Sequence, residues 1–420
     1  PNFTAQYETF TIGTGGVVSP VQLGNRNLKR ELVGEIEVGA DIELFNRFGL
    51  NATYAHSETK DQILPVLIPS ATGFTTQWQN AGTLETKTWE LALNIPILER
   101  RDLTWSARVI YDRSRTHITQ LDVPPFAFGA TPQATETIFR AEAGERYGTF
   151  YGRKFLTSCN ELPETFRGSC GGPTSAFQHN DEGFLVWVGE GNSWRDGITR
   201  NLWQASLTSA EAPWGVGLNW GMPIILRDDS RAALQVPLGN VLPDFRFAVS
   251  QNFSWKRINV YALLDASIGQ DVWNQGRHWA HLDFLAREVD QDGKTVETAK
   301  PIGYYWRAGP PDQAGLQGFY DILAPNNRFV EDASYAKLRE ASVEYRIGPI
   351  RGVGNWAVSL VGRNLFTITD YKGFDPEVGI GPATRTANTG GQANSAAINA
   401  IDAFNFPNLR SFTFGISTSF

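Results

Sequence analysis

The sequence has little of the chemistry that marks several large classes of protein. Its 420 residues include two cysteines and one methionine, and charged residues make up 19%, against roughly 25% in an average soluble domain. No stretch approaches the roughly 18 consecutive apolar residues of a membrane-spanning helix, which excludes a helical membrane protein. Lysine and arginine number 37 against 44 aspartates and glutamates. The chain therefore lacks the basic face that a nucleic-acid binder needs.

Signatures of catalysis and of metal binding are also missing. No G-x-S-x-G, phosphate-binding loop or H-E-x-x-H motif is present, so we expect no enzyme and no cofactor. The five histidines include one close pair, His278 and His281, in an expected loop where their spacing means little. Asp290 and Asp292 resemble the start of a calcium loop, but the closing glutamate is absent, and Asp-Gly is typical of a hairpin turn. We expect no metal, with a metal at the histidine pair as the weaker alternative.

The two cysteines, Cys159 and Cys170, lie close together in a glycine-rich segment. Because no histidine or further cysteine accompanies them, they predict a disulfide and an oxidising compartment outside the cytoplasm. A zinc site is the alternative, disfavoured because it needs four ligands. The chain begins at Pro1 without a basic and apolar leader, so we expect a mature product or a fragment of a longer chain.

Glycine, aromatic residues and a period-two pattern are abundant. Glycine occurs 41 times, phenylalanine 26 times and tryptophan 13 times, all above average usage. The alternation of apolar and polar side chains is clearest from Glu31 to Phe45, and a second such run starts at Phe48 after the turn Asn46-Arg47. This pattern predicts a β-hairpin.

The same pattern along the chain predicts about ten to twelve strands. Short connections are expected around Glu99 to Asp102 and at Lys256-Arg257, and long excursions at roughly 60–80, 120–210, 275–330 and 372–408. One strand is expected from Trp214 to Trp220, and no helical stretch is comparable in length. The last three strands are expected at Tyr335 to Ile347, Trp356 to Phe366 and Leu409 to Phe420.

Two all-β architectures fit many alternating strands: a soluble sandwich or barrel, and an antiparallel transmembrane β-barrel. The strands are long, and short connections alternate with long ones, as in outer-membrane barrels. The polar face from Glu35 to Glu43 carries full charges, which a water-filled lumen tolerates and a packed core does not. Aromatic residues near strand ends suit an interfacial girdle, and they are Trp89, Trp105, Trp255, Trp356 and Tyr371. These features favour the membrane barrel.

The closing segment SFTFGISTSF places Phe412, Phe414 and Ile416 on one face and ends at Phe420. It resembles the terminal-strand signal that the barrel-assembly machinery of bacterial outer membranes reads. A plain amphipathic strand that happens to end the chain is the alternative.

The C-terminal part of the sequence resembles the end of the SusC/RagA group of TonB-dependent outer-membrane transporters. The likeness lies in SYAKLREASVEYRIG and WAVSLVGRNLFTITDYKGFDPEVG, and its most specific part runs from Gly362 to Glu377. Gly24 to Glu31 resembles another motif of the group, with Arg30 where proline is usual. The likeness extends to SATGF and NAG, at residues 70–74 and 80–82, and to the hairpin of residues 237–274. It covers most of the chain outside 120–230.

This resemblance implies a place for the chain in a larger barrel. Members of the group have a plug and a TonB-binding segment ahead of a barrel of about 22 strands, so residues 1–420 are expected to be a part of the barrel near its C-terminal half. Residues 120–230 are expected to form a large extracellular loop region with strands, and 372–408 the last extracellular loop. Because half a barrel leaves unpaired strand edges in lipid, we expect a longer chain or another polypeptide to complete it.

The function that the resemblance implies is outer-membrane import of an oligosaccharide or peptide nutrient. It implies a SusD-like lid lipoprotein, TonB acting through the missing N-terminal region, the barrel-assembly machinery and outer-membrane lipid as partners. Loop aromatics are expected to stack on ligand, with loop packing as the alternative: Trp187, Trp194, Trp279, Tyr304, Tyr305 and Trp306. Two rival functions stay open: a non-energised barrel acting as a diffusion channel or a surface structural or attachment protein, and a soluble β-rich hydrolase or carbohydrate-binding protein.

Overall fold

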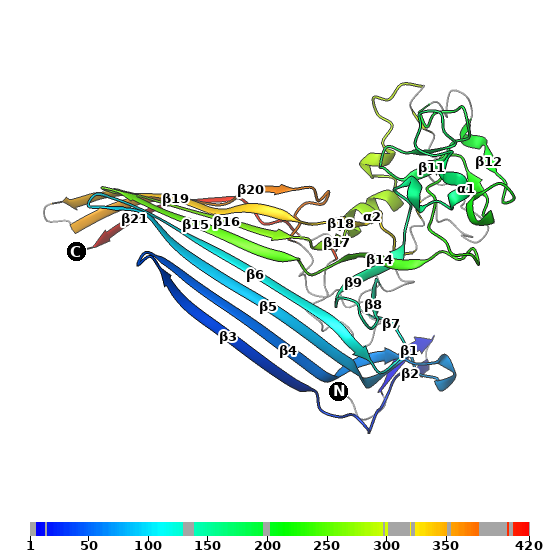
Figure 1. Cartoon of the computed structure of the whole chain (residues 1–420), viewed down its shortest axis with the longest axis horizontal. Helices are drawn as coiled ribbons and strands as arrows, with labels where there is room; N and C mark the ends of the chain where they lie inside the picture. The colour runs from blue at the N-terminus through cyan, green and yellow to red at the C-terminus, as the bar shows by residue number, and fades with distance from the viewer. Residues whose placement is uncertain are drawn as a thin grey trace.

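The computed structural model contains a long, curved sheet of eleven strands (Figure 1). It describes residues 6–12, 15–128, 138–195, 202–296, 299–300, 320, 324–350, 354–377, 401–402 and 406–419. From the C-terminal side the strand order is β21-β20-β19-β16-β15-β6-β5, and β5 then pairs with both β4 and β2. Their bounds are β1 Gln6–Ile12, β2 Gly15–Leu23, β3 Leu32–Leu44, β4 Phe48–Leu67, β5 Thr76–Arg100, β6 Leu103–Leu121, β15 Phe245–Trp255, β16 Ile258–Ile268, β19 Tyr335–Ile350, β20 Gly354–Thr369 and β21 Ser411–Ser419.

Tight turns join neighbouring strands at one end of this sheet, called the turn side below. Phe45 and Asn46 have φ angles of 56° and 52°, and Lys256 has 52°, the left-handed backbone that hairpin turns use. β5 and β6 are joined through residues 101–102 alone. The hairpins expected after residue 45, around Glu99 to Asp102 and at Lys256-Arg257 are confirmed, as are the last three strands within a few residues.

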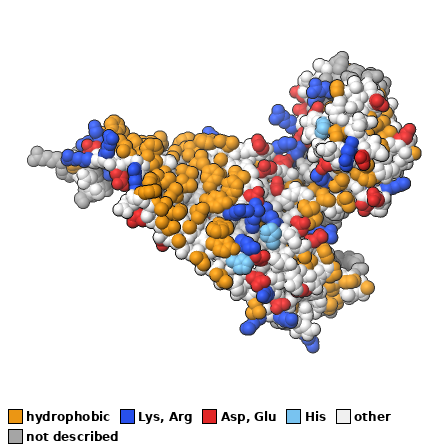
Figure 2. All heavy atoms as spheres, in the orientation of Figure 1, with side chains coloured by type: hydrophobic (Ala, Val, Ile, Leu, Met, Phe, Trp, Pro, Cys, Tyr) orange, Lys and Arg blue, Asp and Glu red, His pale blue; other side chains and the backbone are white. Residues whose placement is uncertain are grey.

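One face of the sheet is apolar across its whole width. An apolar residue on one strand is paired with an apolar residue on the next, because cross-strand neighbours point to the same face of the sheet. Among the described elements none covers this face, and Val38 and Phe412 are 65% and 67% exposed. Figure 2 shows it as a continuous hydrophobic area over the sheet. Two of its rows are Ile42, Leu50, Leu93, Val109, Val249, Leu264, Leu338, Phe366 and Trp105, Phe253, Val260, Val343, Leu360, Phe414.

The opposite face is mostly polar and charged. Glu43, Asn94 and Arg108 occupy one of its rows, and Glu340 and Arg363 continue that row on β19 and β20. Arg363 Nε donates to Glu340 Oε2 at 2.9 Å. An apolar outer face with a polar inner face is the arrangement of a barrel wall between lipid and water. Among the described residues, no helix has the length and hydrophobicity to cross a membrane.

The strands at the N-terminal side are longer than the alternation predicted. β4 and β5 stay paired up to Leu67 and Thr76, through irregular positions near Gln62. The excursion expected at residues 60–80 is therefore wrong, and only residues 68–75 connect the strands, with the short helix η1, Ser70–Thr72. Where a strand extends beyond the lipid, it no longer needs an apolar face. The period-two pattern is therefore lost there, although the hydrogen bonds between the strands continue.

The long connection from β6 to β15 forms its own folded module. Its elements are β7 Phe126–Phe128, β8 Phe139–Ala141, β9 Thr149–Arg153, η2 Cys159–Glu161, α1 Glu164–Arg167, β10 Phe177–His179, β11 Leu185–Trp187, η3 Leu202–Gln204, β12 Ser206–Leu207, η4 Pro213–Gly215, β13 Leu218–Asn219 and β14 Gln235–Asn240. Of the strand expected from Trp214 to Trp220, only the two residues of β13, Leu218–Asn219, are strand. Trp214 has a φ of 53° within η4, and Leu218 and Trp220 are buried in the module's core.

The connection from β16 to β19 packs against this module. It holds β17 Asp271–Trp273, α2 Gln275–Leu282, η5 Arg287–Val289 and β18 Val330–Asp332. His278 and His281 lie on α2, so the loop expected there is wrong at these two positions, and both are 1% exposed. A core of aromatic side chains joins both connections to the sheet, and its members include Phe139, Phe150, Trp273 and Phe329, with Val66 and Ile118 from β4 and β6.

Candidate functional site at the loop end of the barrel wall

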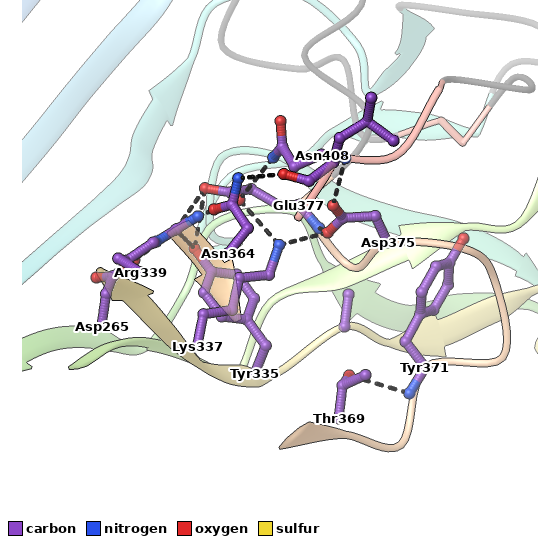
Figure 3. Close-up of polar contacts among 12 residues, drawn as sticks. Asp265, Tyr335, Lys337, Arg339, Asn364, Thr369, Tyr371, Asp375, Glu377 and Asn408 are labelled. Atoms are coloured by element: carbon purple, nitrogen blue, oxygen red, sulfur yellow. Dashed lines mark hydrogen bonds and ion pairs between the residues drawn. The ribbon is translucent and has the colours of Figure 1, made fainter. Parts of the chain in front are cut away.

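A charged cluster lies on the inner face of the wall, where β16 and β19 end toward the long connections (Figure 3). Arg339 donates from Nη1 to Glu377 Oε2 and from Nη2 to Glu377 Oε1, each at 2.6 Å. Its Nε also donates to Asp265 Oδ2 at 2.8 Å. Lys337, with a 3% exposed side chain, bridges Glu377 at 2.9 Å and Asp375 at 2.5 Å. We call Asp265, Lys337, Arg339, Asp375 and Glu377 the last-loop anchor.

The anchor holds both described ends of the connection between β20 and β21. Asp375 and Glu377 come from the segment after β20, and Asn408 precedes β21. Asn408 donates from its backbone to Asp375 Oδ2 at 3.2 Å and from Nδ2 to Glu377 Oε2 at 3.3 Å. Below them, Asn364 Nδ2 donates to the carbonyl of Leu409 at 3.1 Å. The ends of this connection are thus fixed to the wall by charge-assisted hydrogen bonds.

The electrostatics of the anchor keep the Glu377 carboxylate charged. Burial raises the pKa of the Glu377 carboxyl, but the hydrogen bonds and charges of Arg339 and Lys337 lower it to about 2. Nearby, burial and the Asp402 carboxylate raise the pKa of Tyr371, whose hydroxyl donates to Asp402 Oδ2 at 2.7 Å. Such an arrangement holds its members in place by charge-assisted hydrogen bonds.

A second buried network joins the first two long connections. Glu182 accepts hydrogen bonds from Arg277 Nη2 at 2.8 Å and Arg328 Nε at 3.0 Å. Arg277 also pairs with Glu288 at 2.6 Å and Glu331 at 2.9 Å. The side chain of Arg328 is 0% exposed. We call Glu182, Arg277, Glu288, Arg328 and Glu331 the loop brace.

Hydrogen bonds connect the brace to the connection that follows β20. Glu331 Oε2 accepts from the backbone of Lys372 at 3.1 Å. The backbone of Asp402 donates to the Trp273 carbonyl at 2.9 Å, and its side chain accepts from Tyr371. All three long connections therefore form one hydrogen-bonded assembly at the loop end of the wall.

The aromatic residues predicted to bind ligand fall into different surroundings. Trp279, on α2, is 44% exposed, whereas Trp194 is 7% exposed. The Trp194 ring stacks on Trp220 with centroids 5.2 Å apart, and the Lys300 ammonium lies 4.0 Å from its centroid. Trp187, in β11, is half-buried against the module's cores. Tyr304, Tyr305 and Trp306 lie outside the described residues.

The other predicted positions are placed as follows. Cys159 and Cys170 form a disulfide with their Cα atoms 5.8 Å apart, as predicted. Phe412, Phe414 and Ile416 point outward on the last strand, each more than 60% exposed, and Phe420 lies outside the described residues. In the part of the chain that the structure describes, no group of three or more histidine, cysteine, aspartate or glutamate side chains could hold a metal. Burial, with Arg328 and Arg277 nearby, lowers the pKa of His281 to about 2, so its ring is neutral.

Sequence reasoning missed the brace and the role of the anchor. Asp375 and Glu377 lie in the segment from Gly362 to Glu377 that resembles the transporter group, and there they fix the last connection to the wall. The signal that would have located it is the pair Lys337 and Arg339 at the start of a strand whose inner face is otherwise polar. Nothing local marks Glu182 or Arg328, because their partners are far away in the chain.

The fold and site define a class: an outer-membrane β-barrel wall with a braced platform of loops at one end. Comparison with known protein families identifies the family within this class. A profile described as "TonB dependent receptor-like, beta-barrel" matches residues 1–279, so the chain belongs to this family of bacterial outer-membrane proteins.

Relatives and solved structures agree with this assignment. TonB-dependent receptors P3 and P26 of Formosa agariphila are each 25% identical over 94% of this chain. The RagAB peptide importer in its closed-closed state matches 99% of the chain with a TM-score of 0.58 and 18% identity, a similarity of fold. Its open-open state matches with the same TM-score. The chain spans 35% of the length of the two Formosa relatives and 38% of the RagAB chain.

Proposed function

We propose that this chain forms part of the wall and mouth of an outer-membrane importer that takes up oligosaccharides or peptides in a TonB-dependent manner, under a SusD-like lipoprotein lid. The main observation behind this proposal is that the loop brace and the last-loop anchor together fix three long connections at one end of a lipid-facing wall. A lid that delivers cargo needs a fixed surface to close on, and the braced connections supply one. The named activity of RagAB as a peptide importer supports the same proposal.

The proposal places the long connections outside the cell. Outer-membrane barrels have short periplasmic turns and longer extracellular loops, so residues 120–230 and 372–408 are assigned to the outer surface. There, Trp279 presents its ring on α2, with Phe284 equally exposed at 44%. Flat aromatic faces of this kind stack on sugar rings and on peptide side chains. Of the predicted loop aromatics that the structure describes, Trp279 is the best placed for ligand contact.

Uptake by cells carrying the full-length protein tests this function. The probes are two fluorescently labelled mixtures, a tryptic digest of casein and oligosaccharides from partial acid hydrolysis of polysaccharide, each in strains with and without TonB. We expect uptake of one mixture that requires both this protein and TonB. Trp279→Ala should lower that uptake several-fold, and Phe45→Ala, on a side chain 90% exposed at the turn side, should not.

Ion conductance across planar bilayers tests the rival function. An importer closed by a plug conducts little, whereas a diffusion channel conducts steadily without TonB. Steady conductance with TonB-independent uptake would establish the channel in place of the importer. Absence of both uptake and conductance, in protein that is folded at the cell surface, would favour a structural or attachment role.

A further inference from the structure

The outer face of the wall changes character sharply on β4, β5 and β6. The apolar rows end at Tyr54 and Trp89, whose ring centroids lie 4.6 Å apart. Trp89 is 47% exposed, as an aromatic residue at a membrane interface should be. Its cross-strand partner is Arg113. One step further from the turn side, the outward positions are Lys87 on β5 and Arg115 on β6, which pair with each other.

These cations form a patch with too few carboxylates. Arg115 Nη2 and Arg146 Nη1 share Asp244 Oδ1 at 2.7 and 3.0 Å, and Lys87 pairs with Glu85 at 2.7 Å. The Arg113 side chain makes no hydrogen bond or ion pair with any of the described residues. We call Lys87, Arg113, Arg115 and Arg146 the outer basic patch. The ion-pair partners of these cations are two carboxylates, Asp244 and Glu85, while Glu58, across from Glu85 on β4, pairs with Lys60 instead.

Two further observations indicate that the patch suits an anion. The Nε atoms of Arg115 and Arg146 are buried and find no hydrogen-bond partner among the described residues, although Arg146 Nη2 donates to the carbonyls of Leu242 and Pro243. Burial and the nearby Arg115 and Arg113 lower the pKa of Arg146, and Asp244 opposes them. The guanidinium groups are thus close enough to repel one another. An added anion would relieve this repulsion.

The positive excess is confined to the outer face. On the inner face, Thr88 and Ser114 lie between the two outward pairs of the patch. The next inner row toward the turn side holds Glu90 and Asp112 with one cation, Arg246. The wall is therefore not simply rich in arginine at this height. Figure 2 shows basic and histidine side chains at the border of the hydrophobic area.

We propose that the outer basic patch binds the phosphate-bearing headgroup of a lipid in the leaflet at the loop end of the barrel. The occupant follows from position, because the patch continues the lipid-facing surface directly beyond its aromatic border. Guanidinium groups suit phosphate oxygens in number and geometry, and basic residues near a membrane surface attract anionic headgroups. This proposal rests on the proposed function in one respect: the long connections lie outside the cell, so the leaflet is the outer one.

Native mass spectrometry of the full-length protein in detergent tests the proposal without any transport substrate. The protein is titrated with phosphorylated lipid A and, separately, with dephosphorylated lipid A. We expect the wild type to prefer the phosphorylated form at least tenfold. Arg113→Gln with Arg115→Gln should reduce this preference about tenfold or more, since each basic residue contributes about fivefold. Arg246→Gln, the same change on the inner face, should leave it intact.

A second variant keeps the test informative if the glutamine variant misfolds, which heat-dependent electrophoretic mobility reveals. Arg113→Lys with Arg115→Lys retains the charge and should retain most of the preference. Equal binding of the two lipids by the wild type would overturn the proposal, as would equal losses in the outer-face and inner-face variants. Displacement of the lipid by an equal concentration of inorganic phosphate would also overturn it, and would indicate a site for soluble phosphate.

Discussion

The wall, which is the eleven-stranded sheet, and the loop platform, which is the assembly of the three long connections, place their apolar side chains in opposite ways. In the wall, large apolar residues point away from the protein, and Phe414 and Leu360 are 66% and 52% exposed. In the platform, Phe155 and Trp220 are 0% exposed. The wall is stabilised by its backbone ladder and by lipid, whereas the platform stands in water and must build a core of its own. The same chain thus follows two different rules for where apolar residues belong.

The two regions also treat charge differently. Wall charges such as Arg346 and Glu344 pair on the inner face with side chains 62% and 39% exposed, so solvent screens them and each pair stabilises little. In the platform, Arg328 and Arg277 have side chains 0% and 9% exposed. A buried charge depends on its partners far more than an exposed one does. Substitutions in each region should therefore give sharply different results.

The largest effect is expected in the loop brace. Glu182→Gln removes the carboxylate that neutralises Arg277 and Arg328, and should destabilise the platform by about 3–5 kcal/mol, the usual cost of breaking a buried ion pair. Limited proteolysis of the detergent-solubilised protein should show faster cleavage of residues 138–243, while the wall keeps its heat-dependent mobility. Glu190→Gln, an exposed carboxylate in the same module, is the control. Unchanged proteolysis in Glu182→Gln would mean that the brace contributes little to the platform.

A charge in the wall should distinguish its two faces. Leu360→Arg places a guanidinium toward lipid and should destabilise the barrel by about 2–4 kcal/mol if it lies near the midplane. Ser359→Arg, one residue away, points toward the lumen beside Glu344 and should cost little. Denaturant unfolding of the full-length protein in lipid vesicles measures both. Equal costs would contradict the assignment of the apolar face to lipid.

The sequence predicted the wall well and the platform poorly, for one physical reason. A membrane strand has a polar and an apolar face along its whole length, so Ile36 to Leu44 or Phe412 to Ile416 carry a local signal. In the platform, the alternation from Trp214 to Trp220 arises by chance, because these residues contribute to a core that is built from distant segments. The disulfide was predictable because its two cysteines lie 11 residues apart.

The site was predictable only in part. Asp375 and Glu377 stand in a recognisable segment, but their partners Lys337 and Arg339 come from another strand, and pairing of this kind has no sequence signature. The same holds for Glu182 and its partner Arg328, which are 146 residues apart. Strand length was underestimated at Leu67 and Thr76, because a strand beyond the lipid loses its alternation but keeps its hydrogen bonds.

Loss of the disulfide should affect the platform alone. Cys159→Ser with Cys170→Ser opens a short loop, and the chain-entropy model gives about 3 kcal/mol at most for a bridge of this span. We expect proteolysis to accelerate between residues 150 and 180, with no change in the denaturant midpoint of the wall. Wild-type protein treated with a reductant should behave like the double variant. A shift in the wall midpoint would show that the disulfide also stabilises the wall.

The smallest effect concerns the last-loop anchor, the point where platform and wall meet. The pKa of Glu377 is about 2 in the folded protein, below its usual value of about 4.3 in an unfolded chain. Its contribution is therefore fully present above about pH 4.3 and is lost as the pH falls toward about 2. Because its side chain is 28% exposed, solvent reduces the loss to about 1–2 kcal/mol.

Hydrogen exchange of the backbone amides of residues 371–377, corrected for intrinsic rates, measures this loss between pH 6 and pH 2.5. Exchange in the wild type should accelerate several-fold over this range, because a protonated carboxyl no longer holds the Arg339 and Lys337 cations. Glu377→Gln should exchange rapidly at both pH values, since it lacks the charge throughout, and Glu190→Gln should follow the wild type. If Glu377→Gln kept the wild-type pH dependence, another group would control the junction. The wall and the platform would then be coupled through the hydrogen bonds of Tyr371 and Asp402 instead.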